Sequence, residues 1–185
     1  APTDFPARIG LVISNVPDAA GLDRARDAGI ATTVIDHRKF DGRESFEAAL
    51  DQALARSDID FICLAGFMRL LTPGFVNRWN NRLINIHPSL LPAFKGLDTH
   101  ARVLADGARF TGCTVHFVRA EMDHGPIIIQ AAVPVHPSDD EARLAARVLA
   151  AEHQCYPQAL RLIAEGRVQV TGEEIAVIKG TASPD

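Results

Sequence analysis

Residues 83–92 read Leu-Ile-Asn-Ile-His-Pro-Ser-Leu-Leu-Pro, a short apolar run that breaks abruptly into polar residues and proline. Alternation places Asn85 and His87 on the same side of the predicted strand. Three other apolar runs precede it, with helical patterns between them, at residues 8–13, 32–35 and 61–65. Strands that alternate with helices predict a parallel, right-handed, doubly wound α/β sheet with flanking helices. Open sheets of this kind bind ligands at the carboxyl ends of their strands.

Local signals mark the helices and strands of the first half. Asp41 and Glu44 have the spacing of a capping box, which predicts a helix to about Ser57. Thr72 as a cap and Pro73 at the first helical position predict a short helix. Residues 61–65 are apolar throughout, which is typical of a strand buried on both faces.

The second half of the chain has a different pattern. We expect a helix from Asp98 to Gly107, then strands at 114–118 and 127–133 joined by a turn. A Ser138–Glu141 capping box opens a further helix, which is expected to break at Pro157 and to resume to Glu165. Residues 167–179 are expected to form a strand or hairpin. The chain has no repeat, low-complexity tract or obvious linker. We therefore expect one domain over residues 1–185, with 180–185 as a tail.

Composition excludes several classes of protein. Nineteen Lys and Arg against 23 Asp and Glu give a net charge of −4 over 185 residues, which argues against a dedicated nucleic-acid binder. No apolar run approaches the roughly 20 residues that a membrane-spanning helix needs. The chain has three cysteines, an odd number, and no C-x-x-C pair: Cys63, Cys113 and Cys155. We therefore expect ordinary thiols in a reducing compartment. The prediction is a cytoplasmic protein without a membrane or nucleic-acid partner.

Asn85 and His87 are the leading candidates for chemistry. An amide and a protonated imidazole can both bind a developing oxyanion, and the imidazole can also transfer a proton. Alternatively, the two side chains satisfy backbone groups at the end of a strand. Asp123 lies in a tight turn before Gly125, where it either makes a local turn or folds over His87 and stabilises an imidazolium. The spacing of these residues does not decide between the two.

Other motifs are ambiguous or missing. His116 lies inside a predicted strand and is either structural or catalytic, while His100 and His153 are expected at helix surfaces or caps. Residues 64–71 read Leu-Ala-Gly-Phe-Met-Arg-Leu-Leu. This segment either belongs to the core, with its arginine in an ion pair, or forms an apolar wall with one cation that would bind a flat acidic ligand. The sequence has no zinc-ligand spacing, nucleophile elbow or glycine-rich phosphate loop.

Four segments, in order along the chain, resemble the glycinamide ribonucleotide transformylases: residues 64–71, 85–92, 112–118 and 123–126. The resemblance runs from about residue 9 to about residue 170. It implies a Rossmann-like formyltransferase fold. It also implies direct transfer of a formyl group from 10-formyltetrahydrofolate to the amine of glycinamide ribonucleotide in purine synthesis, without a metal or a covalent enzyme intermediate.

The same resemblance implies roles for individual residues. His87 would be the proton donor and oxyanion stabiliser, Asn85 would bind the formyl oxygen, and Asp123 would sustain the charged His87 and relay the proton of the amine. Supporting positions would be Thr114 and His116. Ribonucleotide contacts would be Pro88 and Glu152, with no hydrogen bond expected from Leu149. Folate contacts would be Arg43, Met68, Arg69, Leu70, Leu71, Asn85, Arg119, Ala120, Glu121, Met122 and Asp123.

The chain departs from the family pattern at its beginning. The family starts with a strand and a glycine-rich loop that holds the phosphate of the substrate at a helix N-terminus. Here residues 1–8 look like the link into the second strand of the family. We therefore expect that a first βα unit of roughly 20–30 residues is missing from the sequence as given. The alternative is a natural truncation, which would bind the ribonucleotide very weakly.

Three rival functions remain open. Methionyl-tRNA formyltransferase would add a C-terminal RNA-binding domain. Formyltetrahydrofolate hydrolase would add a regulatory domain in front and a different residue where this chain has Pro88. A non-catalytic folate-binding protein would have no need to keep Asn85, His87 and Asp123 together, so the presence of all three favours an enzyme.

Overall fold

The computed structural model describes residues 4–172 and 175–178, and the strands in these ranges form two hydrogen-bonded sheets. The smaller sheet pairs β1 (Val12–Ser14) with β2 (Thr32–Val34). The larger sheet has the order β3-β4-β5-β6-β8-β7. Its strands are β3 (Ile62–Leu64), β4 (Leu83–His87), β5 (Phe110–Phe117), β6 (Ile127–Pro134), β7 (Val168–Thr171) and β8 (Ile175–Ile178).

The strand pairs confirm the α/β class and show where the sheet changes direction. β1 pairs with β2, β3 with β4 and β6 with β8 in parallel, while β4–β5, β5–β6 and β7–β8 are antiparallel. The sequence predicts the strands in the correct order. It does not predict that β1 and β2 form a separate pair, because an apolar run identifies a strand but not its neighbours.

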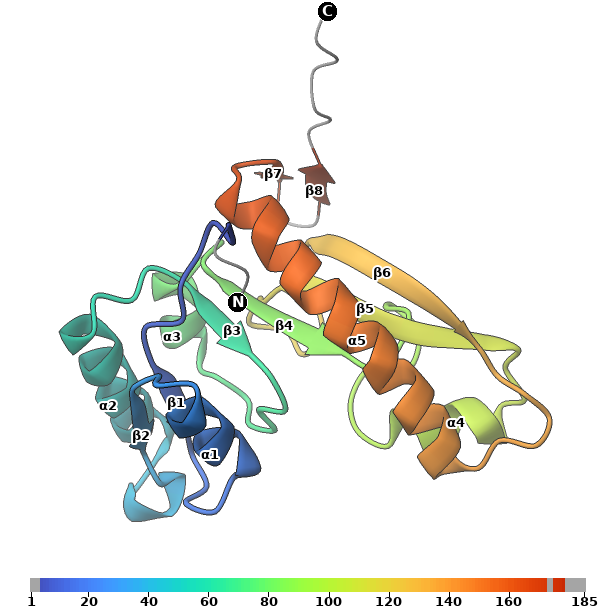
Figure 1. Cartoon of the computed structure of the whole chain (residues 1–185), viewed down its shortest axis with the longest axis horizontal. Coiled ribbons are helices and arrows are strands. Elements are labelled where there is room, and N and C mark those ends of the chain that lie inside the picture. The colour runs from blue at the N-terminus through green and yellow to red at the C-terminus, as the bar shows by residue number, and fades with distance from the viewer. Residues whose placement is uncertain (1–3, 173–174, 179–185) are drawn as a thin grey trace, which may run out of the picture.

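Five α-helices flank the strands of the described residues. They are α1 (Ala20–Asp27), α2 (Arg43–Arg56), α3 (Pro73–Arg78), α4 (Thr99–Ala105) and α5 (Glu141–Ala164), with a short 3-10 helix at His37–Lys39. Helix α5 runs diagonally across the larger sheet, packing on β5 and β6, and it also meets α4 (Figure 1). Within the described ranges, none of these helices combines the length and the apolar character needed to cross a membrane.

Strand β4 lies between two apolar clusters because its side chains alternate between the two faces of the sheet. Leu83 packs with α2 and α3 through Phe46, Phe75 and Trp79. Ile84, fully buried, packs instead in the cluster formed with β5, β6 and α5. The strand that carries the candidate catalytic residues is therefore buried on both faces.

Strand β3 differs from its prediction. Residues 61–65 are expected to be buried on both faces, yet Ile62 and Leu64 are only half-buried and Cys63 is exposed. Cys113 and Cys155 are buried, and all three cysteines are free thiols. An uninterrupted apolar run thus marks a strand here without marking complete burial.

Helix boundaries follow some of the predicted signals and not others. As predicted, Thr72 caps α3 and accepts a hydrogen bond from the Phe75 amide. The two predicted capping boxes are wrong. Gly42, not Asp41, precedes α2, and Asp140, not Ser138, caps α5 by accepting from the Arg143 amide. Each helix starts one or two residues later than the S/D-x-x-E pattern predicts.

Pro157 does not interrupt the C-terminal helix, because α5 continues through it to Ala164. Proline removes one backbone hydrogen bond from a helix interior, but packing can offset that cost. Here the flanking turns bury Cys155, Ala159 and Leu162. The predicted hairpin at the end of the chain is present as β7 and β8, while the predicted tail at 180–185 lies outside the described residues.

Candidate active site

The register of three strands brings the candidate residues together. Antiparallel pairing of β4 with β5 sets Asn85 opposite His116 and His87 opposite Thr114. Parallel pairing of β3 with β4 sets Leu64 opposite Asn85. Asn85 is half-buried, and its side-chain amide makes no hydrogen bond to any residue in the described ranges. This amide is therefore available to a ligand.

His87 is buried and both of its ring nitrogens face acceptors. Nδ1 lies 3.4 Å from Asp123 Oδ1, and Nε2 lies 2.9 Å from the carbonyl oxygen of Phe94. The Phe94 carbonyl can only accept, so Nε2 donates to it. Nδ1 lies within ion-pair distance of the Asp123 carboxylate and makes no hydrogen bond to it, so its N–H stays open to a ligand when the ring is protonated. The geometry suits an imidazolium, and the contact between His87 and Asp123 that the spacing left open is present.

A tight turn carries Asp123 over His87. Gly125 has φ of +127°, and a Cβ at this position would lie 2.1 Å from the Phe117 carbonyl oxygen, so the turn requires glycine. Asp123 itself has φ of +48°, which aspartate tolerates better than most residues. Its Oδ2 accepts a hydrogen bond of 2.7 Å from the Gly96 amide. One carboxylate oxygen therefore faces the imidazole and the other is held by the backbone.

Thr114 holds the segment that follows His87 against β5. Its fully buried Oγ1 donates to the Ser89 carbonyl and accepts from the Leu91 amide and from Nε2 of Gln130, at 2.7, 3.0 and 2.9 Å. Ser89, also fully buried, donates to the carbonyl of Ala93. Sequence reasoning did not identify Ser89 or Gln130, since neither residue type marks a support role.

Thr114→Val is expected to lower the free energy of unfolding by about 2 kcal/mol, because it removes the partner of the Ser89 carbonyl and of the Leu91 amide. Denaturant unfolding measures this change. Thr111→Val is the matched control: Thr111 is buried on the same strand, and its Oγ1 has no hydrogen-bond partner in the described part of the chain. This second variant should change the stability by less than about 0.5 kcal/mol. Equal losses in both variants would contradict the support role of Thr114.

His116 is a neutral neighbour of Asn85. Burial lowers the pKa of His116 below its usual value, although the Phe117 carbonyl, Asp123 and a backbone contact with His124 partly oppose the shift. Nδ1 of His116 lies 3.0 Å from the Phe117 carbonyl and therefore donates to it. His116 thus lies beside the candidate amide as an uncharged ring, which suits a support role.

Helix α5 supplies two side chains one turn apart. Glu152 is half-buried, and loss of solvent raises its pKa above the usual value, with His153 and His87 acting in the opposite direction. Tyr156 donates its hydroxyl to the Leu64 carbonyl at the end of β3, and the Ile84 carbonyl lies 3.3 Å away. Sequence reasoning missed Tyr156, because a tyrosine inside a long amphipathic helix carries no signal for a distant carbonyl.

The first expected folate segment, residues 68–71, leaves β3 beside Asn85. Met68 and Leu70 are 79% and 58% exposed, so apolar surface is available there. The Arg69 guanidinium lies over the Phe46 ring, with 6.0 Å between Cζ and the ring centroid. Immediately after this segment, the buried carboxylate of Glu47 accepts from the amide and hydroxyl of Thr72. Helix α2 thereby anchors the segment at its end.

The second expected folate segment is the turn from Arg119 to Asp123. Arg119 donates to the Asn81 side chain at 2.8 Å, Glu121 lies 3.7 Å from Lys95, and Met122 is 50% exposed. Ala120 is exposed beside them. Arg43 is the first residue of α2, and its side chain has no hydrogen bond or ion pair with any residue of ranges 4–172 and 175–178. Arg43 lies one helical turn before Phe46, over whose ring the Arg69 guanidinium lies.

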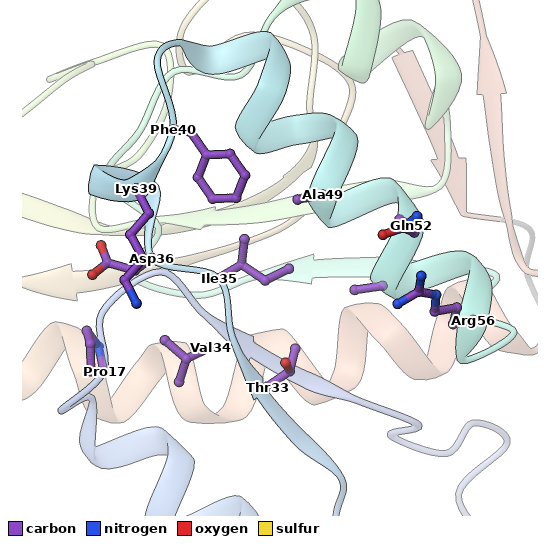
Figure 2. A pocket seen from close by; sticks show the side chains of 11 residues that line it. Pro17, Thr33, Val34, Ile35, Asp36, Lys39, Phe40, Ala49, Gln52 and Arg56 are labelled. Atoms are coloured by element: carbon purple, nitrogen blue, oxygen red, sulfur yellow. The ribbon is translucent and has the colours of Figure 1, made fainter.

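A separate open cavity of about 520 Å³ lies between β2 and α2 (Figure 2). Its lining includes Val34, Ile35, Phe40, Lys39 and Arg56, and none of the candidate catalytic side chains reaches it. No group of three or more His, Cys, Asp or Glu residues that could hold a metal ion is found in the described part of the chain. The candidate site is therefore the cluster around β4.

Comparison with known proteins gives consistent matches. The family model described as "Formyl transferase" matches residues 3–160. The human trifunctional purine biosynthetic protein adenosine-3 is 51% identical over 164 residues, which is 89% of this chain but 16% of that protein. Phosphoribosylglycinamide formyltransferase of Escherichia coli is 45% identical over 176 residues, covering 95% of this chain and 82% of that one.

Solved structures agree with these matches. The crystal structure of glycinamide ribonucleotide transformylase 1 from Symbiobacterium toebii superposes with a TM-score of 0.90 at 47% identity. That alignment covers 94% of this chain and 81% of the other. The chain spans about one sixth of the length of the human trifunctional relative and most of the length of the bacterial ones.

Proposed function

This chain belongs to the formyl transferase family, and from that premise we propose that it transfers a formyl group from 10-formyltetrahydrofolate to the amine of glycinamide ribonucleotide in purine biosynthesis. The observation that carries the proposal is the convergence of Asn85, His87 and Asp123 at the carboxyl end of β4. The Escherichia coli relative named for this reaction matches 95% of the chain, which supports the same assignment.

The geometry suggests how the three side chains share the reaction. The amine attacks the formyl carbon, and the carbonyl oxygen gains negative charge as the new C–N bond forms. The side-chain amide of Asn85 and the Nδ1–H of His87 stabilise that oxygen, while Nε2 stays on the Phe94 carbonyl, because fixed donors aimed at a developing charge lower the barrier. Asp123 stabilises the imidazolium and relays the proton lost by the amine. The bond between the formyl carbon and the folate nitrogen then breaks, and that nitrogen takes up a proton.

Binding roles follow the same proposal. The exposed apolar side chains of Met68, Leu70 and Met122 support a site for a flat folate ring. We assign the folate to Arg43, Met68, Arg69, Leu70, Leu71, Asn85, Arg119, Ala120, Glu121, Met122 and Asp123, the ribonucleotide to Pro88 and Glu152, and support to Thr114 and His116. Residues 1–185 would form one formyltransferase domain in the cytoplasm, acting on small molecules without a metal, nucleic acid or membrane.

The KM for the ribonucleotide is expected to rise as the pH falls. The rise should begin at a higher pH than it would for a glutamate with an ordinary pKa. Both oxygens of the ionised Glu152 carboxylate accept hydrogen bonds, and protonation removes the charge and turns one of them into a donor. Burial raises the pKa of Glu152, so this loss begins at a higher pH. Steady-state kinetics across the acidic range measure this dependence. Glu152→Gln is the control, since it should show a high KM with little dependence on pH. The same pH dependence in both proteins would contradict the assignment.

The test of function is a formyl-transfer assay with glycinamide ribonucleotide as acceptor and with water and methionyl-tRNA as competitors. Purified protein should formylate the ribonucleotide and leave the other two acceptors almost unchanged. Release of formate to water would indicate a hydrolase, and formylation of the tRNA would indicate the tRNA-directed enzyme. Folate binding without any turnover would indicate a binding protein, and any of these three results would overturn the proposal.

A further inference from the structure

Both members of the His87–Asp123 pair are held by the loop Phe94–Leu97. The Phe94 carbonyl accepts from Nε2 of His87 at 2.9 Å. The Gly96 amide donates to Oδ2 of Asp123 at 2.7 Å. The loop therefore contributes one backbone acceptor to the imidazole and one backbone donor to the carboxylate. Its conformation fixes both contacts, whatever its side chains are.

Two non-glycine residues in and next to this loop adopt backbone conformations that their side chains disfavour. Phe94 has φ of +55° and the adjoining Asp98 has φ of +53°, in the left-handed region that non-glycine residues adopt at a cost. Gly96, at φ of +85°, is better suited to such a conformation. A strained backbone conformation persists only where surrounding contacts hold it.

Arg102 supplies those contacts from the side of α4 that faces the loop. Its Nη1 donates to the Lys95 carbonyl at 2.6 Å and to the Leu97 carbonyl at 3.3 Å. Its Cζ lies 5.7 Å from the centroid of the Phe94 ring, within the range of a cation–π contact. One exposed guanidinium thus contacts three of the four residues of the loop.

We propose that Arg102 is a positioning residue for formyl transfer, which acts by holding the Phe94–Leu97 loop against the His87–Asp123 pair. This inference rests on the proposed function for its kinetic consequence and on the contacts above for its structural one. Arg102 does not touch the reacting atoms. It orients the imidazole and the carboxylate through the Phe94 carbonyl and the Gly96 amide.

Loss of Arg102 is expected to lower kcat by about tenfold, because misplacing a catalytic group by a fraction of an ångström is costly. Substrate binding should change little, so KM for both substrates should stay within about threefold of the original. The alkaline limb of the kcat profile should move to lower pH, since an imidazolium that loses a hydrogen-bond acceptor is less stabilised. In the described ranges, the titratable groups shown to interact with His87 are Asp123, by direct contact, and His100, His116 and Glu152, electrostatically.

The experiment compares Arg102→Met, Arg102→Lys and Arg82→Met with the unaltered chain. Arg102→Lys keeps the charge and one donor, and should restore at least half of the lost kcat. Arg82 is a matched control because it is also exposed, donates to a backbone carbonyl and lies 4.8 Å from an aromatic ring, that of Trp79. Arg82→Met should have the kinetics and pH profile of the unaltered chain.

A second measurement needs no substrate. Titration of the His87 ring by NMR should show a midpoint at lower pH in Arg102→Met and the original midpoint in Arg82→Met. If the unaltered chain does not transfer formyl groups, the proposed function is overturned. A shifted His87 midpoint in Arg102→Met would still support the structural part of the inference. Normal kcat, an unmoved pH limb and an unmoved midpoint in Arg102→Met would overturn the positioning role. So would a rise in kcat, which would make the loop an inhibitor of His87.

Discussion

His87→Asn lowers kcat by about 10³-fold while the affinity for folate stays within a few-fold, if the imidazole acts as proposed. The reason is that His87 would interact with the formyl oxygen mainly after charge has developed on it. Asparagine keeps a hydrogen-bond donor but cannot transfer a proton near neutral pH. Stopped-flow or steady-state formyl transfer measures kcat, and equilibrium binding of a folate analogue measures the affinity.

The His87→Asn variant also needs a check on folding, because His87 is only 5% exposed. His116→Asn is the comparison, since His116 is equally buried on the neighbouring strand and is proposed only to support the site. It should lose far less activity than His87→Asn. Near-normal turnover in His87→Asn would remove the imidazole from the mechanism.

Asp123→Asn is expected to lower kcat by about 100-fold and to move the alkaline limb of its pH profile to lower pH. The asparagine side chain is nearly isosteric and can still accept from the Gly96 amide, so the turn should keep its shape. It carries no charge, however, and the imidazolium 3.4 Å away loses its electrostatic stabilisation. Because the reaction needs the protonated ring, activity should then disappear at a lower pH.

Glu121→Gln is the matched control for the pH profile alone, because Glu121 is assigned to the folate and its substitution is expected to act on KM rather than on the alkaline limb. Glu121 lies in the same turn and also loses a charge, but its carboxylate faces Lys95 and His124 rather than His87. Its pH profile should follow that of the unaltered chain. A profile for Asp123→Asn that coincides with both would exclude Asp123 from the proton chemistry.

The sequence predicts the α/β class and the central strand because both depend on patterns that neighbouring residues determine. Alternation alone puts Asn85 and His87 on one side of β4, and the regular pairing of β4 with β5 continues through both residues. The contact between His87 and Asp123 was not predictable in the same way. It depends on a turn whose path is set by Gly125 and by a carbonyl of a different strand residue, Phe117.

Three further features were beyond the reach of sequence patterns. The Phe94 carbonyl and the Gly96 amide belong to the backbone, which every residue has, so no residue type marks them. The half-buried state of β3 depends on which elements cover it, not on its own apolar residues. Arg102 looks like any exposed arginine of an amphipathic helix until the loop beside it is known.

The hydroxyl of Tyr156 has a consequence for the encounter of the two substrates. It ties α5 to the backbone of β3 and β4 at a point adjacent to Asn85, and Glu152 lies one turn away on the same helix. The residue assigned to the ribonucleotide and the residue assigned to the formyl oxygen are thus parts of one rigid body. Holding two reactants on one rigid body raises their effective molarity, because the entropy of bringing them together is lost on binding rather than in the chemical step.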